Sequence, residues 1–416
     1  MQKLWKGIGF VLVGVSAVLI LYWNVALYYR PAVAVHPGQV EYDDLLHELR
    51  GLKQAMDNGA AADMQQLYPE GYIFMHALYG LAWADVAARA DVGGSLRHEA
   101  FLEIETSVAR LGSNTARDIF DEYLPLSYGA FYQGWYNYTV GRKLLLQAPS
   151  KRPASEVAAF QARCRDIAQA IRSDKTPYPA SYRFGAWPAD AVVGVASLAL
   201  HDKLFKPQYR NVMDAWITRV RAQLDTYGLI PHEVDPVTGA ILEEARGSSQ
   251  SLMLSFLPEV DAVFAREQFK RYRALFVTHR FGLPCIREYP AGTIGFGDID
   301  SGPVILQAGA AASLAGLRTL ALYDEQPLYV GLRNSIEAFG VPMTHGGKKQ
   351  YLFGQLPMAD AFIAWGHAAA DPSASAPGIW QLKFHLYSAG LVLLAGGAWL
   401  YFRKRRMKNI TIGMLF

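Results

Sequence analysis

The sequence predicts an all-α fold, an (α/α)6 toroid of helical hairpins flanked by one N-terminal and one C-terminal transmembrane helix. Three observations support this prediction. Long apolar helices begin at six places spaced 54 to 63 residues apart, helices with interleaved charges lie between them, and an uncharged stretch lies near each end. The common solenoid repeats have only about 34–47 residues. The longer spacing therefore favours a closed ring of six hairpins.

The six apolar helices are expected to form the inner ring. Proline suits the first turn of a helix because its missing N–H would have no partner there. Segments that are apolar nearly all round, such as residues 192–200 and 305–317, are typical of helices buried on both sides. One start is Gly247, which follows Arg246. The other five starts contain a proline: Pro69, Pro125, Pro188, Pro303 and Pro357.

Helices of a second kind alternate with the first. Their charges are interleaved with apolar residues at three- and four-residue spacing, a pattern that gives a helix one buried and one solvated face. We expect these helices to form an outer ring around the apolar ones. They are predicted at residues 42–56, 97–111, 155–171, 209–224, 265–277 and 328–339.

Two uncharged segments predict membrane anchors. Residues 7–29 are 23 uncharged residues and residues 386–402 are 17, and a helix needs roughly 20 apolar residues to cross a bilayer. Lys3 and Lys6 precede the first segment, and five basic residues follow the second. The positive-inside rule then places both termini in the cytoplasm. The alternative for the first segment is a cleaved signal peptide, with the cleavage pattern at residues 32–34.

The predicted organisation has four parts. Residues 1–30 form an N-terminal anchor, 31–380 an extracytoplasmic toroid, 381–408 a C-terminal transmembrane helix with a basic cytoplasmic end, and 409–416 a tail. The expected location is the inner (cytoplasmic) membrane, and the expected partners are the membrane and a glycan or other small substrate. The formal charge of +3 is too small to indicate nucleic acid. Subunits of a membrane complex are not identified by the sequence.

Acidic residues gather at the predicted starts of the inner helices, which should meet at one rim. A carboxyl held among aromatics and other acids has a raised pKa, which suits a general acid, and a second carboxylate could act as base or nucleophile. The alternative is that each acid only caps its helix. The candidate catalytic residues are Glu70, Asp190, Glu288, Asp298 and Asp300.

Aromatic and basic residues at the same level are candidates for substrate binding. Flat rings with polar edges bind the faces of sugars, and an arginine could clamp a carboxylate or balance the acids. These candidates are Arg246, Arg287, Tyr72, Tyr128, Trp187, Tyr289 and Ser248. The histidines show no metal-ligand spacing, and the sequence has no dinucleotide fingerprint or phosphate loop. We therefore predict neither a metal nor a cofactor.

Several segments occur in an order that resembles a known group of proteins. They are residues 246–251 (RGSSQS), 267–269 (EQF), 282–284 (GLP), 287–290 (REYP) and 298–303 (DIDSGP). In these segments the chain is similar to membrane-attached bacterial proteins of the six-hairpin glycosidase-like superfamily, related to linalool dehydratase/isomerase-like sequences. The resemblance implies an (α/α) toroid with its pocket at the inner helix starts. That superfamily includes hydrolases, lyases, epimerases and dehydratases, so it does not fix the reaction.

The leading functional prediction is a membrane-anchored, extracytoplasmic carbohydrate-active enzyme. It would be a glycoside hydrolase that uses paired carboxylates on an envelope or exported glycan. One alternative is a dehydratase or isomerase of a small apolar alcohol. The resemblance implies pocket cysteines for such an enzyme, and only Cys285 lies near the predicted pocket. The other alternative is a non-catalytic subunit that binds glycan or serves in assembly.

Overall fold

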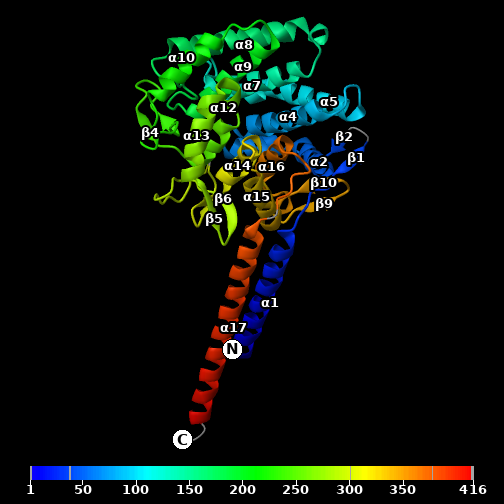
Figure 1. Ribbon diagram of the computed structural model, residues 1–416, viewed down its shortest axis with the longest axis vertical. Helices are drawn as coiled ribbons and strands as arrows, with labels where there is room; N and C mark the ends of the chain where they lie inside the picture. Colours follow the sequence, from blue (N-terminus) through cyan, green and yellow to red (C-terminus); the bar gives the residue numbers. More distant parts are fainter. Residues whose placement is uncertain (1, 37–38, 300, 377, 414–416) are drawn as a thin grey trace.

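The computed structural model describes residues 2–36, 39–299, 301–376 and 378–413. Within these residues the fold is mostly helical (Figure 1). Six of the described helices form a closed ring, in which each packs against the next and the last packs against the first. In ring order they are α4 (Gly71–Arg89), α7 (Gly129–Leu145), α9 (Pro188–Leu204), α11 (Gly247–Leu254), α14 (Ala310–Leu322) and α16 (Pro357–Ala369). The inner ring predicted from the sequence is present.

Six amphipathic helices surround this ring, and each packs against at least one inner helix. All six overlap the segments predicted for the outer ring. They are α2 (Asp43–Asp57), α5 (Ser95–Leu111), α8 (Ala154–Ser173), α10 (Arg210–Arg221), α13 (Ala262–Leu275) and α15 (Gln326–Phe339). Shorter helical pieces complete the connections: α3 (Ala60–Leu67), α6 (Asn114–Arg117), α12 (Leu257–Val260), η1 (Pro149–Lys151) and η2 (Leu352–Gly354).

The prolines mark some inner helix starts more closely than others. Pro188 and Pro357 occupy the first helical position, as predicted, and α11 begins at Gly247. The prediction of a helix start at Pro303 is wrong, because a hairpin separates this proline from α14. The turn of that hairpin is formed by Leu306 and Gln307, both with positive φ, a conformation outside the right-handed α-helix.

Short antiparallel hairpins build the connections between the rings. Backbone bonds join neighbouring connections at the inner helix starts, as from Ala130 to Ala180 and from Val234 to Ala186. These bonds fix the rim loops relative to one another. The pairs are β1 (Ala34–His36) with β2 (Gln39–Glu41), β3 (Glu233–Val234) with β4 (Ile241–Glu243), β5 (Val277–Arg280) with β6 (Leu283–Ile286), β7 (Val304–Ile305) with β8 (Ala308–Gly309), and β9 (Met343–His345) with β10 (Lys348–Gln350).

Aromatic side chains fill the centre of the ring near the inner helix starts. Phe74 of α4, Phe131 of α7 and Phe362 of α16 belong to the first two turns of their helices, and the ring of Phe74 contacts both others. Trp135 is fully buried against Phe74 and Trp365. These contacts show that α4, α7 and α16 start at the same end of the ring. The lumen below the rim is a packed core.

A buried ionic triad links three inner helices farther from the rim. Asp85 of α4 binds Arg142 of α7 at 2.6 Å through one carboxylate oxygen and Arg318 of α14 at 2.7 Å through the other. Arg318 also lies over the ring of Trp365. One carboxylate between two guanidiniums compensates charges that would otherwise be buried alone. The triad therefore joins α14 to α4 and α7, neither of which is its neighbour in the ring.

Two long helices, α1 (Gln2–Ala26) and α17 (Ile379–Gly413), lie side by side and project from the helical body (Figure 1). Both chain termini lie at the far end of this pair. At the body, α1 packs against α15 and α17 against β6. Between the two helices, Asn24 donates a hydrogen bond to Ser388 at 3.2 Å.

The prediction of two transmembrane helices, and with it the inner-membrane location, is corrected by the structure. Within the described part of the chain, no helix combines the length and the apolarity needed to cross a bilayer. Residues 7–29 and 386–402 were predicted to span the membrane because they have no charges. Absence of charge is a weaker condition than sustained apolarity along a helix. The first uncharged run extends past the end of α1 at Ala26 and includes the polar Asn24.

Replacing Gly247 by alanine is expected to destabilise the rim. A Cβ atom at this position would lie 1.8 Å from the backbone oxygen of Arg287, so the adjacent loop would have to move. We expect the free energy of unfolding to fall by about 1–3 kcal/mol, as measured by denaturant unfolding. Gly194→Ala in α9 is the control, because its Cβ would meet Ile167 at an ordinary 3.5 Å. Equal stabilities of the two variants would contradict this prediction.

Candidate functional site

An ion-pair network lies where α11 begins, and Arg246 is at its centre. The Nε of Arg246 donates to Glu288 Oε1 at 2.9 Å, and its Nη1 donates to Asp298 Oδ2 at 2.5 Å. Ser248 Oγ donates to the same Glu288 oxygen at 2.7 Å. Because one planar guanidinium contacts both carboxylates, their bound oxygens lie within roughly 8 Å of each other. The structure thus brings together two predicted acids and two predicted binding residues.

The backbone around Glu288 explains how the network is positioned. Strand β6 ends at Ile286, directly before the site, and the backbone N–H of Gly247 donates to the carbonyl of Glu288 at 2.8 Å. Arg287 forms a backbone bridge with Ala308 at the end of β8. The first turn of α11 and two hairpins therefore hold Glu288 between them. The ring of Tyr289 lies 5.4 Å from the Arg246 guanidinium and covers one side.

The two carboxyls have opposite shifts in pKa. Glu288 is completely buried, and burial raises the pKa of its carboxyl to about 7 against the opposing effect of Ser248 and Arg246. The side chain of Asp298 is about half exposed. Burial tends to raise its pKa, but hydrogen bonds from Arg246 and Ser301 outweigh this and hold the pKa well below its usual range. Near neutral pH, Glu288 can therefore carry a proton while Asp298 is ionised.

His232 and Glu243 complete the network, although neither was among the predicted site residues. His232 Nδ1 hydrogen-bonds to Ser249 at 3.0 Å, and its Nε2 lies 3.5 Å from Arg246. Burial, and then the charge of Arg246, lower the pKa of His232 to about 3, so the imidazole is neutral. Glu243 lies 3.5 Å from Arg246. Its position three residues before Arg246 was the one available sequence signal.

A second group of predicted residues gathers at the starts of α4 and α9. Tyr182 donates a hydrogen bond to Glu70, and its ring contacts Trp187 edge-on at 5.2 Å. Asp190 is buried in the first turn of α9 and hydrogen-bonds to Ser181. Burial is the main cause that raises its pKa to about 7, and the charge of Glu70 adds to it. Asp190 also borders a small, mostly apolar cavity between α7, α8 and α9.

Replacing Asp190 by asparagine is expected to stabilise the protein at alkaline pH. The pKa of Asp190 is raised in the folded state, so the folded chain holds a proton that the unfolded chain releases near pH 4. Stability should then fall as the pH rises from about 4 to about 7, and remain lower above that range. We expect Asp190→Asn to exceed the wild type in free energy of unfolding at pH 8, with the advantage shrinking toward pH 4. The control is Asp63→Asn, because Asp63 is exposed. If the difference in free energy of unfolding between Asp190→Asn and the wild type does not change with pH, the raised pKa of Asp190 is refuted.

The other predicted residues lie apart from the Arg246 network or outside the described residues. Arg287 hydrogen-bonds through its guanidinium to Gln307, and its role in clamping a carboxylate or balancing the acids stays a prediction. Tyr72 is buried and packs on His76 at 4.5 Å. Tyr128 packs against Tyr132 and lies under Arg117. Asp300 falls outside the described part of the chain.

Cys285 shows no sign of an activated thiol. It lies on β6, opposite Thr278 of β5, and is partly buried. Burial raises the pKa of its thiol to about 11, which favours the neutral form at physiological pH. A reactive cysteine needs the opposite shift. The other cysteine, Cys164, is buried in α8 and is also free.

The comparisons with known proteins find similar solved structures but no matching protein family. No protein-family model matches the chain, and no curated protein matches it. One similar solved structure is an unsaturated glucuronyl hydrolase from Bacillus sp. GL1 that degrades glycosaminoglycan, with 12% identity, a TM-score of 0.43, and coverage of 88% of this chain and 98% of that one. A second, described as a UGL variant with dGlcA-Glc-Rha-Glc, has the same values. Neither description mentions linalool dehydratase/isomerase, so that resemblance stays a prediction.

Proposed function

We propose that this chain is a carbohydrate-active enzyme of the glycoside hydrolase type, with its reaction centre at the Arg246 network. Glu288 is the general acid, and Asp298 is the carboxylate that activates water. The observation that carries the proposal is a pair of carboxyls with opposite pKa shifts on one guanidinium. Environments that separate two pKa values in this way assign the acid and the base.

The reaction follows from these two protonation states. Protonated Glu288 donates its proton to the glycosidic oxygen as the bond from that oxygen to the anomeric carbon breaks, and the leaving sugar departs as an alcohol. Asp298 accepts a proton from water, and the water oxygen bonds to the anomeric carbon. This step is that of an inverting pair, whose carboxyls lie about 6.5–9.5 Å apart. In a retaining pair, at about 5–5.5 Å, Asp298 would instead bond to the anomeric carbon as the leaving sugar departs, and Glu288 would then take a proton from the water that displaces Asp298. The separation of at most roughly 8 Å admits both. The anomeric form of the first product distinguishes them.

Access to Glu288 is part of the proposal. Asp298 faces solvent in part, whereas Glu288 is enclosed by its neighbours. One oxygen of Glu288 and one nitrogen of Arg246, Oε2 and Nη2, are buried without a hydrogen-bond partner among the described residues. Substrate binding would separate Asp298 from Arg246 and give these atoms hydroxyl partners, a gating step of a kind common in enzymes. Tyr289 beside Arg246 offers a flat face to a sugar ring.

Hydrolysis of a panel of aryl glycosides and polysaccharides tests the proposal. The panel should include neutral and uronate-containing chains, with released reducing ends as the readout. We expect cleavage of at least one member by the wild type and loss of that cleavage in Asp298→Asn. The control is Glu267→Gln, because exposed Glu267 lies on the outer helix α13 and pairs with Arg221 of α10, neither of which belongs to the network. The result would indicate a non-catalytic binding protein if the wild type cleaves no member of the panel and Asp298→Asn binds a glycan with the same affinity as the wild type.

A further inference from the structure

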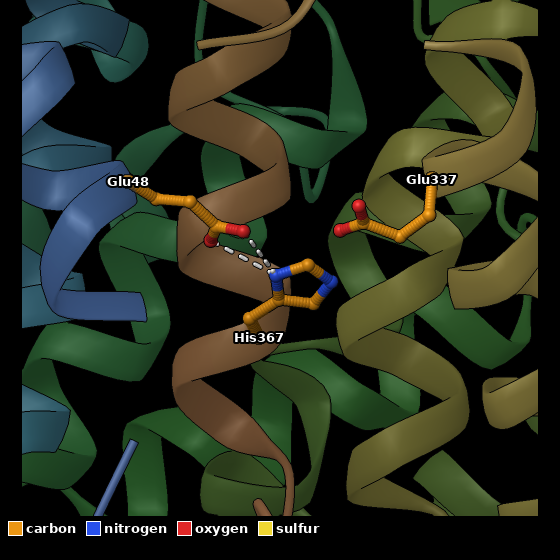
Figure 2. A group of neighbouring side chains, drawn as sticks. All are labelled: Glu48, Glu337 and His367. Atoms are coloured by element: carbon orange, nitrogen blue, oxygen red, sulfur yellow. Dashed lines mark hydrogen bonds and ion pairs between the residues drawn. The ribbon is translucent and has the colours of Figure 1, made fainter. Parts of the chain in front are cut away.

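A buried polar cluster far from the Arg246 network joins the outer helices α2 and α15 to the inner helix α16. Glu48 of α2, Glu337 of α15 and His367 of α16 are each at most 2% exposed. One potential ligand atom from each residue lies within 4.8 Å of the other two. Figure 2 shows the three side chains pointing toward one another from their separate helices.

The histidine in this cluster has one nitrogen engaged and one unengaged. His367 Nδ1 lies 2.9 and 3.1 Å from the two oxygens of Glu48. An ionised carboxylate only accepts hydrogen bonds, so Nδ1 must carry the proton. His367 Nε2 is buried without a hydrogen-bond partner among the described residues, and in Figure 2 it faces Glu337.

The cluster already attracts a cation. Lys349, on β10, places its ammonium 2.7 Å from Glu337, 3.3 Å from Glu48 and 3.7 Å from Asp44. Three carboxylates thus share one lysine in a buried space. Since uncompensated buried charge is costly, the position favours a cation with more than one charge. The Tyr351 hydroxyl lies 2.8 Å from Glu48 and 2.6 Å from Glu337. Its single proton is donated to one of them at a time, and the hydroxyl holds the two carboxyls together.

We propose that Glu48, Glu337 and His367 bind a divalent transition-metal ion of the zinc type, which displaces the Lys349 ammonium. His367 Nδ1, which loses its proton on binding, and one oxygen from each glutamate are the ligands. Imidazole and carboxylate together suit Zn²⁺, whose bonds to nitrogen and oxygen are about 2.0–2.2 Å long. The ligand atoms would close toward the ion from their present separation. Because the ion would join α2, α15 and α16, it would stabilise the closure of the two rings.

Replacing Lys349 distinguishes a metal site from a cluster that is only an ion-pair network, because the two predict different outcomes. Lys349→Met removes the competing cation, while Lys348→Met changes the exposed neighbour in the same strand and is the control. Full-length protein is first treated with a chelator. Thermal unfolding then follows a titration with Zn²⁺, and visible absorption follows a titration with Co²⁺. We expect Lys349→Met to be less stable than Lys348→Met without metal, and to recover with Zn²⁺. Its affinity for Zn²⁺ should exceed that of the wild type roughly tenfold or more, because a charge close to the site is removed.

His367→Gln separates this site from adventitious binding. In this variant the Co²⁺ absorption and the Zn²⁺ stabilisation should both be lost, with one ion per chain bound by the wild type. If Lys349→Met does not fold, the comparison of wild type with His367→Gln alone decides the question. The proposal is overturned if Zn²⁺ does not stabilise Lys349→Met. It is also overturned if His367→Gln shows the same Co²⁺ spectrum as the wild type. Either result would identify the cluster as an ion-pair network that needs only Lys349.

Discussion

Glu288→Gln is expected to lower kcat/KM for glycan hydrolysis by about 10²–10⁴-fold, the usual contribution of a general acid. Glutamine keeps the shape of the side chain and can still accept hydrogen bonds from Ser248 and Arg246, which hold Glu288 at 2.7 and 2.9 Å. It cannot donate an acidic proton to a leaving oxygen. The loss should therefore appear in kcat with little change in the folded structure, as measured by steady-state kinetics and circular dichroism.

The pH dependence adds a second readout for the same residue. Because the pKa of Glu288 is about 7, wild-type activity should decline as the pH rises through neutrality, where the acid loses its proton. A glycoside with a leaving group that needs no protonation should partly restore the activity of Glu288→Gln. Equal losses on good and poor leaving groups would argue that Glu288 only positions Arg246.

Asp85→Asn is expected to reduce the free energy of unfolding by about 3–5 kcal/mol, the usual cost of breaking a buried ion pair from one side. The substitution leaves Arg142 and Arg318, both largely buried, without a counter-charge between them. Denaturant unfolding followed by circular dichroism measures the loss. Since this triad lies away from the rim, the stable fraction of the variant should keep its substrate affinity.

A matched surface pair provides the control for Asp85. Asp118 binds Arg117 at 3.3 Å with both side chains well exposed, and exposed pairs contribute at most about 1 kcal/mol. Asp118→Asn should therefore be nearly neutral in the same experiment. A loss at Asp85 no larger than at Asp118 would mean that water compensates the two arginines, contrary to the packing described above.

Much of the fold was predictable because its signals are local. Interleaved charges marked all six outer helices, and Pro188 and Pro357 marked two inner starts at the first helical position. Pro303 misled the prediction, since proline suits a turn before a hairpin as well as a helix start. The uncharged segments misled it too, because absence of charge does not measure apolarity along a helix.

Of the predicted site residues, Arg246 and Ser248 lie at the start of α11, whereas Glu288 and Asp298 lie in the connection between β6 and β7. Arg246, Ser248, Glu288 and Asp298 were all named as candidates, but no sequence feature showed that one guanidinium joins the two acids. Arg287 was equally plausible, yet its side chain turns to Gln307. The cluster of Glu48, Glu337 and His367 lay beyond sequence reasoning altogether. Its members are far apart in the chain and meet only because α2, α15 and α16 pack together.

The protonation state of Glu288 is the central claim, and infrared difference spectroscopy tests it without a substrate. The spectrum of Glu288→Gln is subtracted from that of the wild type at a series of pH values, which isolates this carboxyl from others with raised pKa such as Asp190. We predict a neutral carboxyl band at pH 5 to 6 that disappears with a midpoint near the pKa of about 7. A Glu288 carboxyl that is ionised throughout this range, with a pKa at or below the ordinary value of 4.5, would contradict its assignment as the acid.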